Sequence, residues 1–238
     1  LAKILQVKDY ILWRLTGVLA TEANEASATL MMDFTTRDWS DSMIGLAGIS
    51  RAQLPPIRPS FGITGHLSAL AAEQTGLRPG TPVIVGAGDV GALAVGCGAF
   101  GSGVAAITLG TAGHVVLAAP EGPGNDIPGL WRMSHVTDDR EIWLGLIMAG
   151  GLSIAWLRDL IGGMLPHDLS FETMAEMAAK VPAGARGALF FPFLEGAATP
   201  WAVPQARAAF DGFTTSHGAP EMIRAVHEGV AYNIRACL

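Results

Sequence analysis

Residues 83–96 read VIVGAGDVGALAVG, an apolar run, a glycine-rich turn and a second apolar run. This order predicts a strand that leads through glycines into a helix, which is typical of an α/β domain. Gly86, Gly88 and Gly91 have the spacing G-x-G-x-x-G of dinucleotide-binding sites. Asp89 lies inside the pattern. Two hypotheses follow, in which either the glycines or the aspartate is the functional feature.

A dinucleotide site needs more than the three glycines. An acidic residue should follow about 20 residues later, where it binds the ribose. The first acidic residue after Asp89 is Glu121, which lies too far along the chain. The fingerprint also normally opens its domain, whereas a large segment precedes it here. Nicotinamide or flavin binding is therefore not expected.

Asp89 follows the predicted strand over residues 83–85 and begins a predicted helix over residues 90–100. The helix dipole and the free amides of the first turn favour an ionised carboxylate there. α/β sheets bind their ligands at this end of the strands. Such a carboxylate can accept a proton from a substrate hydroxyl. Simple helix capping is the alternative, and Asp89 alone does not exclude it.

A second glycine turn lies in ITLGTAGHVV, residues 107–116. The β-rich runs on either side, over residues 104–109 and 114–118, predict a hairpin. Its tight turn is expected to expose successive backbone amides beside the hydroxyl of Thr111, and such a nest suits phosphate oxygens. A proton acceptor and a phosphate nest together suggest phosphoryl transfer to an alcohol.

Composition excludes several other classes of protein. The 238 residues are 50% hydrophobic and carry a net charge of -6 without a basic run, which argues against a nucleic-acid surface. Residues 90–120 contain no Asp, Glu, Lys or Arg, but their glycines favour a buried core over a membrane span. The two cysteines and six histidines have no metal-ligand spacing. A reduced, cytoplasmic protein is expected, with its histidines at the surface or in caps.

Strands and helices alternate along the rest of the chain, and residues 195–209 are predicted to be irregular. The helices predicted there include residues 3–15, 153–161 and 171–180, and the strands include residues 189–193. The chain begins and ends within helix-like runs, so we expect a fragment of a longer protein. The glycine-rich residues 98–103 are the expected domain boundary.

Ordered motifs along nearly the whole chain resemble the FGGY family of carbohydrate kinases, above all its xylulose kinase-like members. The segments that carry the resemblance are KDYILWRLTG (8–17), TEANEASATLMMDFTTRDWS (21–40), GAGDVGALAVGCGAFGSG (86–103), ITLGTAG (107–113), AGGLSIAWLRD (149–159), FFPFLEGAATPW (190–201) and ARAAFDGFTTSHGAPEMIRAVHEGVAYNIR (206–235).

The resemblance implies an actin-like ATPase (ribonuclease H-like) fold of two α/β domains, of which this chain is a part. Residues 1–101 would be the later part of the sugar-binding domain, and residues 102–238 the first part of the ATP-binding domain. The implied activity is ATP-dependent phosphorylation of a sugar hydroxyl, most of all on a ketopentose such as xylulose. The alternatives are a kinase for glycerol or another polyol, and a non-catalytic sugar- or nucleotide-binding actin-like protein.

The resemblance also implies roles for five residues. Asp89 is the general base on the sugar hydroxyl, and Val90 lies beside the substrate. Gly110 and Thr111 approach the ATP phosphates, and Gly151 lies near the nucleotide. Mg²⁺ is expected with ATP, because the transferred phosphoryl charge needs a metal, but no residue is assigned as its ligand.

Three residues depart from the family pattern, so the substrate stays open: Val90, Ala112 and Ala155. The family's first phosphate loop, D-x-G-T, and its late glycine-rich adenosine motif do not occur in these 238 residues, which are therefore expected to be inactive alone. The expected partners are a small-molecule sugar and ATP, with neither nucleic acid nor membrane. A homodimer is compatible with this interpretation.

Overall fold

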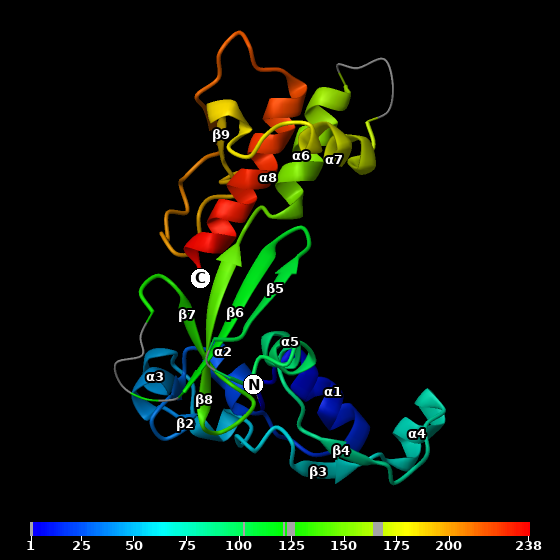
Figure 1. The fold of residues 1–238 in the computed structure, drawn as a ribbon. Helices are drawn as coiled ribbons and strands as arrows, with labels where there is room; N and C mark the ends of the chain where they lie inside the picture. The colour runs from blue at the N-terminus through cyan, green and yellow to red at the C-terminus, as the bar shows by residue number, and fades with distance from the viewer. Residues whose placement is uncertain (1, 102, 121, 123–126, 164–168) are drawn as a thin grey trace. The chain divides into compact units, whose positions relative to one another are not determined.

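A computed structural model describes residues 2–101, 103–120, 122, 127–163 and 169–238 (Figure 1). The chain divides into two compact units, each described here by itself. Unit 1 comprises Leu1–Val104, Leu117–Asp126 and Arg132–Trp143, and unit 2 comprises Ala105–Val116, Ile127–Trp131 and Leu144–Leu238. The first change of unit lies between Val104 and Ala105, one residue after the glycine-rich residues 98–103. The assignment of residues 1–101 and 102–238 to two domains stays a prediction.

The helices begin and end at residues with clear local signals. Gly17 ends the first helix in the left-handed conformation, with φ of 76°, and its N–H donates to the Trp13 carbonyl. The helices of unit 1 are α1 (Val7–Thr16), α2 (Ala23–Ala28), α3 (Asp41–Leu46), η1 (Arg51–Gln53), α4 (Ala69–Thr75) and α5 (Asp89–Gly96). Those of unit 2 are α6 (Gly151–Gly162), α7 (Phe171–Ala179), η2 (Ala185–Gly187) and α8 (Ala219–Ala236). The predicted helices are thereby confirmed, with shifts of a few residues at their ends.

The strands form one four-stranded sheet, in the order β5-β6-β8-β7, and three antiparallel pairs. The four strands are β5 (Ala105–Leu109), β6 (Gly113–Pro120), β7 (Trp131–Ser134) and β8 (Arg140–Ile147). The pairs are β1 (Met32–Asp33) with β2 (Asp38–Trp39), β3 (Ile63–His66) with β4 (Pro82–Ile84), and β9 (Leu189–Phe191) with β10 (Ala209–Asp211). The predicted hairpin is confirmed as β5 and β6, joined by residues 110–112.

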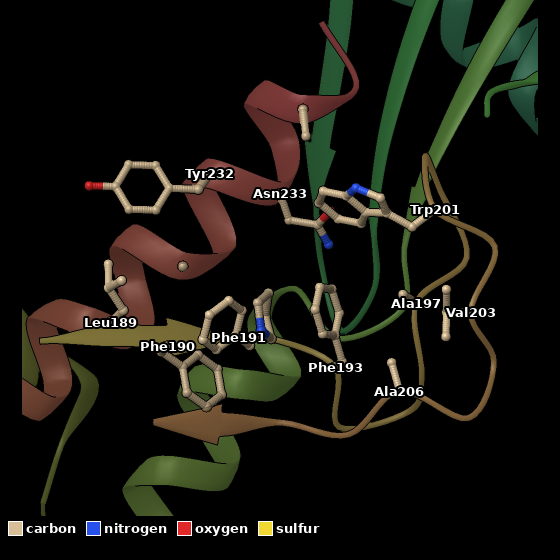
Figure 2. A pocket seen from close by; sticks show the side chains of 13 residues that line it. Leu189, Phe190, Phe191, Phe193, Ala197, Trp201, Val203, Ala206, Tyr232 and Asn233 are labelled. Atoms are coloured by element: carbon tan, nitrogen blue, oxygen red, sulfur yellow. The ribbon is translucent and has the colours of Figure 1, made fainter. Parts of the chain in front are cut away.

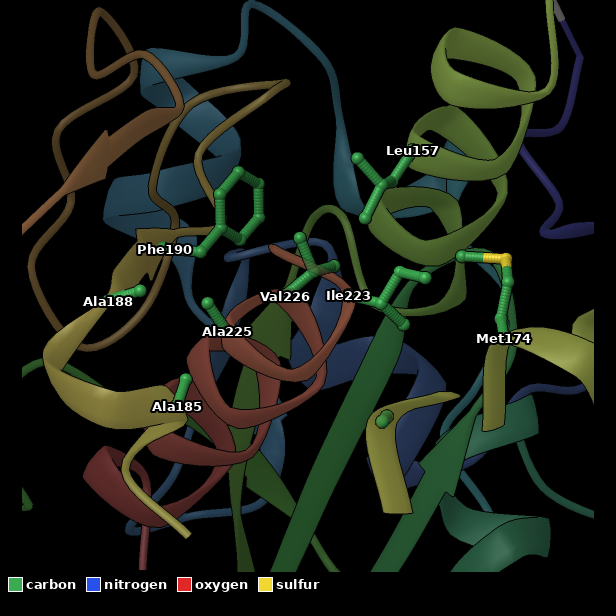
Figure 3. Close-up of a cluster of buried hydrophobic side chains, with 9 residues drawn as sticks. Leu157, Met174, Ala185, Ala188, Phe190, Ile223, Ala225 and Val226 are labelled. Carbon is green, nitrogen blue, oxygen red and sulfur yellow. The ribbon is translucent and has the colours of Figure 1, made fainter. Parts of the chain in front are cut away.

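Each unit has an apolar cluster of its own. In unit 2, the buried side chains of Leu157, Met174, Phe190, Ile223 and Val226 bring α6, α7, β9 and α8 together (Figure 3). In unit 1, one buried cluster consists of Ala23, Ala26, Met32, Trp39, Ile44 and Leu54. Burial of apolar surface of this kind is the main term that stabilises a unit, at about 25 cal/mol per Å². No described helix is long and apolar enough to cross a membrane.

The strand predicted at residues 83–85 forms, but the prediction that it is buried is confirmed only for Val85, which is 5% exposed. The observed strand, β4, has Ile84 47% exposed, since it pairs only with β3. Strand β3 was not predicted, because the four residues ITGH, with a glycine among them, are too few to show a period. Short strands β7 and β10 were missed as well, and each is too brief to show a period.

The prediction that the histidines lie at the surface or in caps was wrong for His135, which is 0% exposed in unit 1. Its Nε2–H donates to the Ala99 carbonyl at 3.1 Å, and its Nδ1 accepts from the Thr137 amide at 3.1 Å. Both ring nitrogens of a neutral imidazole are thus satisfied. Burial lowers the pKa of His135, and the charges of Arg140 and Arg37 lower it further against the opposing effects of the Ala99 hydrogen bond and Asp139.

His135 therefore predicts a pH-dependent stability. A histidine whose pKa is lowered in the folded state contributes stability above its unfolded pKa, about 6.5, and loses it as the pH falls below that value. We expect His135→Gln to be less stable than the unsubstituted chain at pH 7.5. The difference should shrink toward pH 5.5, by at most about 1.4 kcal/mol per pH unit. Denaturant titrations of both chains at the two pH values measure it, and equal differences would contradict it.

Candidate functional site

Asp89 is the first residue of α5, and its side chain is exposed in unit 1. Its Oδ1 accepts a hydrogen bond from the Val90 amide at 2.8 Å, which is a local helix-start contact. The preceding residue, Gly88, is the N-cap and has no side chain with which to cap the helix. Helix capping therefore accounts for the hydrogen bond to Oδ1 of Asp89. It does not involve the second carboxylate oxygen, Oδ2. Val90 is half-buried.

The amides around Asp89 are bound by side chains from the segment around α2. The Gly88 amide donates to Glu22 Oε1 at 3.1 Å, and the Gly91 amide donates to Asn24 Oδ1 at 3.2 Å. Both acceptor side chains are 0% exposed. The first amides of a helix have no partners within the helix, so these bonds do the work of a cap from outside it. The turn that presents Asp89 is thus held on both sides.

These contacts explain two of the glycines in the G-x-G-x-x-G pattern. A Cβ atom at Gly88 would clash with Glu25 Oε2 and would lie 2.8 Å from Asn24 Oδ1. A Cβ atom at Gly91 would lie 2.7 Å from Asn24 Oδ1. Gly86 has φ of 80°, a conformation that favours glycine. The glycines allow the turn to approach α2, and no bound dinucleotide is needed to explain them.

Sequence reasoning missed Glu22, Asn24 and Glu25. It used the stretch TEANEAS only as part of a family motif, and did not recognise that four of its polar residues are buried, among them Glu22 and Asn24. Burial raises the pKa of Glu25, which the charge of Lys8 opposes and the charges of Glu22, Asp9 and Asp89 reinforce. The surroundings of Asp89 are therefore rich in carboxylates. A cluster of polar residues between small ones, TEANEAS, was the available signal.

In unit 2, the structure brings Gly110, Thr111 and Gly151 together. The Gly110 amide donates to the Ala112 carbonyl at 2.9 Å. The carbonyls of Gly110 and Thr111 accept from the first two amides of α6, those of Gly151 at 2.7 Å and Leu152 at 3.1 Å. A Cβ atom at Gly151 would lie 2.6 Å from the Gly110 carbonyl oxygen, so only glycine allows this approach.

These bonds leave few donors for a phosphate group in the hairpin turn. The amides of Gly110 and Gly151 are already used, whereas those of Thr111 and Ala112 donate to no other residue in the described ranges. Thr111 is exposed, and it adds a side-chain hydroxyl to the same turn. An anion at the turn would therefore meet two amides and one hydroxyl. The Gly110 amide, which was predicted to form part of the nest, instead donates its hydrogen bond within the protein.

A cavity of about 600 Å³ lies elsewhere in unit 2, between α8 and the segment that follows β9. Figure 2 shows Phe191, Phe193, Trp201 and Tyr232 around it, together with Asn233. None of the five predicted site residues lines it. Its apolar and aromatic walls do not suit a phosphate, so its size alone does not identify the site.

The residues that the structure describes contain no group of three or more His, Cys, Asp or Glu side chains that could hold a metal ion. Mg²⁺ needs less than this from a protein, because it keeps several waters and is often bound by one or two carboxylates plus substrate phosphates. Single carboxylates such as Asp89 are of the right chemical type. The geometry assigns none of them as a ligand.

The close packing of α5 against α2 predicts different effects on stability for alanine substitutions at two glycines of this helix. Gly91→Ala places a methyl group against the Asn24 side chain and should destabilise unit 1 by about 1–3 kcal/mol. Gly96→Ala is the matched control, since no atom lies within 4 Å of its Cβ position. It should be neutral or stabilising by up to about 1 kcal/mol. Denaturant titration of both variants checks this, and equal effects would refute it.

The comparisons with known proteins agree on the family. Residues 1–96 match the N-terminal domain of the FGGY family of carbohydrate kinases, and residues 105–238 match its C-terminal domain. A xylulose kinase from Bacillus subtilis (strain 168) is 32% identical over 234 residues, which are 98% of this chain and 46% of that protein. A gluconokinase from the same strain is 32% identical over 242 residues, with coverages of 98% and 46%.

A solved structure, that of ligand-bound xylulose kinase from Lactobacillus acidophilus, matches this chain with a TM-score of 0.91 at 27% identity. The match covers 99% of this chain and 47% of that one, and it confirms the predicted actin-like α/β fold. The chain spans about half the length of the relatives that it matches. With both family domains matched in order, the chain belongs to the FGGY family of carbohydrate kinases.

Proposed function

We propose that the intact protein carrying this chain transfers the γ-phosphoryl group of ATP to a hydroxyl of a sugar, most of all a ketopentose such as xylulose. The observation that carries the proposal is the exposed carboxylate of Asp89, on a turn whose flanking amides are bound by Glu22 and Asn24. The similarity to xylulose kinases at 32% identity supports the substrate class. Family membership supports the reaction type.

In the proposed step, Asp89 accepts the proton of the sugar hydroxyl as its oxygen attacks the γ-phosphorus. The new oxygen–phosphorus bond forms while the bond to the β-phosphate oxygen breaks, which releases ADP. General-base catalysis of this kind contributes about 10²–10⁴ in rate. Val90, half-buried beside the base, would contact the substrate through its apolar surface.

For the nucleotide, we propose that the turn of residues 110–112 contacts the phosphates. Thr111 would supply its amide and hydroxyl, and Ala112 its amide, since these donors have no other partner in the described part of the chain. Gly110 and Gly151 would position the turn, because the close contact between their backbones holds residues 110–112 against the start of α6. Mg²⁺, expected with ATP, would neutralise phosphate charge, and no residue of this chain is assigned to it.

A sugar acid is the second candidate substrate, because a gluconokinase is as similar as the xylulose kinase. Glycerol or another polyol, and a non-catalytic sugar- or nucleotide-binding role, remain as further alternatives. ADP release by the intact protein, measured with xylulose, gluconate and glycerol, separates these four hypotheses. The sugar-binding and ATP-binding domains, a homodimer and a cytoplasmic location also stay proposals, as does the inactivity of the 238 residues alone.

The proposed base predicts a large loss of turnover in Asp89→Asn. The amide keeps the shape of the side chain but cannot accept the proton, so kcat should fall by about 10²–10⁴ in the intact protein, with a smaller change in sugar affinity. Asp41→Asn is the matched control, because Asp41 is also an exposed first residue of a helix, α3. Steady-state kinetics with the best sugar measures both. Near-normal turnover in Asp89→Asn would remove this residue from the mechanism.

The proposed phosphate contact predicts weaker use of ATP in Thr111→Val. Loss of one hydroxyl beside the phosphates should raise KM for ATP several-fold, about the effect of one hydrogen bond to a charged group. Sugar affinity measured without ATP should not change. Thr111→Ser keeps the hydroxyl and should restore most of the loss. A fall in sugar affinity with unchanged ATP parameters would show that the turn does not bind nucleotide.

A further inference from the structure

We infer that Glu22 and Asn24 are positioning residues for catalysis, which fix the Gly88–Gly91 turn and thereby the place of the Asp89 carboxylate. The inference rests on the proposed role of Asp89 as the base. It assigns a function to two buried polar side chains that do not belong to the reacting groups. Together we name them the α2 clamp.

Glu22 is a carboxylate with 0% exposure, and both of its oxygens accept hydrogen bonds. Oε2 accepts from the Asn24 amide at 2.7 Å and from Ser60 Oγ at 3.3 Å. Oε1 accepts from the Glu25 amide at 3.0 Å and from the Gly88 amide at 3.1 Å. One carboxylate therefore joins the start of α2 to the N-cap of α5, across 66 residues of sequence.

Lys8 supplies a positive charge near Glu22. Lys8 Nζ lies 3.6 Å from Glu22 Oε1 and 2.6 Å from Asp9 Oδ1, and Asp9 is itself buried. A buried carboxylate is tolerated only where hydrogen bonds and a paired charge replace water. This arrangement fixes Glu22 in one geometry, because any movement would break several bonds at once. The Gly88 amide is fixed with it.

Asn24 holds the other side of the turn. Its Oδ1 accepts from the Gly91 amide, and its Nδ2 donates to the Ser134 carbonyl at 2.8 Å. The side-chain amide thus uses a donor and an acceptor at the same time, and a residue of only one kind could not replace it. Because Gly91 is the third residue of α5, this bond orients the first helical turn. Asp89 lies between the two bound amides.

Glu25 does not form part of the clamp. Its carboxylate lies against Gly88, but among the described residues it accepts no hydrogen bond from the turn. Protonation of Glu25 would therefore leave both clamp bonds in place. The clamp depends on Glu22 remaining an acceptor at both oxygens and on the amide of Asn24.

The test compares Glu22→Gln with the unsubstituted protein. Since both oxygens of Glu22 accept from N–H groups, the amide of Gln must face one of these donors with its own N–H₂ group. Glu221→Gln is the matched control. Glu221 is a buried carboxylate at the start of α8 that accepts from the Gly218 amide at 3.0 Å, and it lies in unit 2.

Two measurements are made. In the 238-residue chain, hydrogen exchange of the Gly88 amide, followed by NMR, should become about tenfold faster in Glu22→Gln and stay unchanged in Glu221→Gln. In the intact protein, kcat should fall about 10–100-fold in Glu22→Gln, because a misplaced reacting group costs this much. KM for ATP should stay within about twofold, and Glu221→Gln should keep its kcat. This split distinguishes positioning from a general loss of stability.

Asn24→Ala is the second variant, and it tests the inference if Glu22→Gln does not fold. It should speed exchange at Gly91 and lower kcat to a similar extent. The inference is overturned if an active protein keeps its kcat in either folded variant, or if exchange at Gly88 and Gly91 does not change. Failure of the proposed function would have a different sign, because the unsubstituted protein would then show no sugar-dependent ADP release. That result would also refute the catalytic role of the clamp.

Discussion

The cost of an unpaired buried charge is the constraint on which the turn of unit 1 depends. Glu22 has no access to solvent, so every lone pair that water would otherwise satisfy must find a donor within the protein. The donors that it uses come from the start of α2, from Ser60 and from the Gly88 amide, and the Lys8 ammonium lies 3.6 Å away as a paired charge. The hydrogen bonds that offset the desolvation cost of Glu22 therefore also fix the turn that carries Asp89.

In unit 2, the first amides of a helix are bound by backbone carbonyls and not by a charged side chain. The first amides of α6 would lack partners, and the carbonyls of Gly110 and Thr111 supply them. Such a bond between two backbones requires a close approach, which Gly151 allows because it has no Cβ. In both units a helix start is therefore capped by another segment, and a polar side chain on the turn, Asp89 or Thr111, remains exposed.

Much of this arrangement could be predicted from local sequence, because it depends on local signals. The glycine turns, the helices that follow them and the β5–β6 hairpin all have periodic or turn-forming residues within a few positions. The contacts of Glu22 and Asn24 could not be predicted in this way, since their partners lie 66 and 67 residues away. The buried state of His135 was missed for the same reason, as its partner Ala99 is 36 residues distant. Strand β3 was missed because a four-residue strand with a glycine has no period to detect.

The G-x-G-x-x-G spacing shows why a glycine pattern alone does not identify a ligand. In a dinucleotide site the second glycine allows the backbone to approach a pyrophosphate, and the third allows a helix to pack on a strand. Here Gly88 and Gly91 leave room for different neighbours, the polar side chains of Glu25 and Asn24. Both situations exclude a Cβ atom at the same spacing, so the sequence pattern is the same. What separates them is the position of the acidic partner. It follows the glycines by about 20 residues where a ribose is bound, whereas in this chain Glu22 precedes Gly88 by 66 residues.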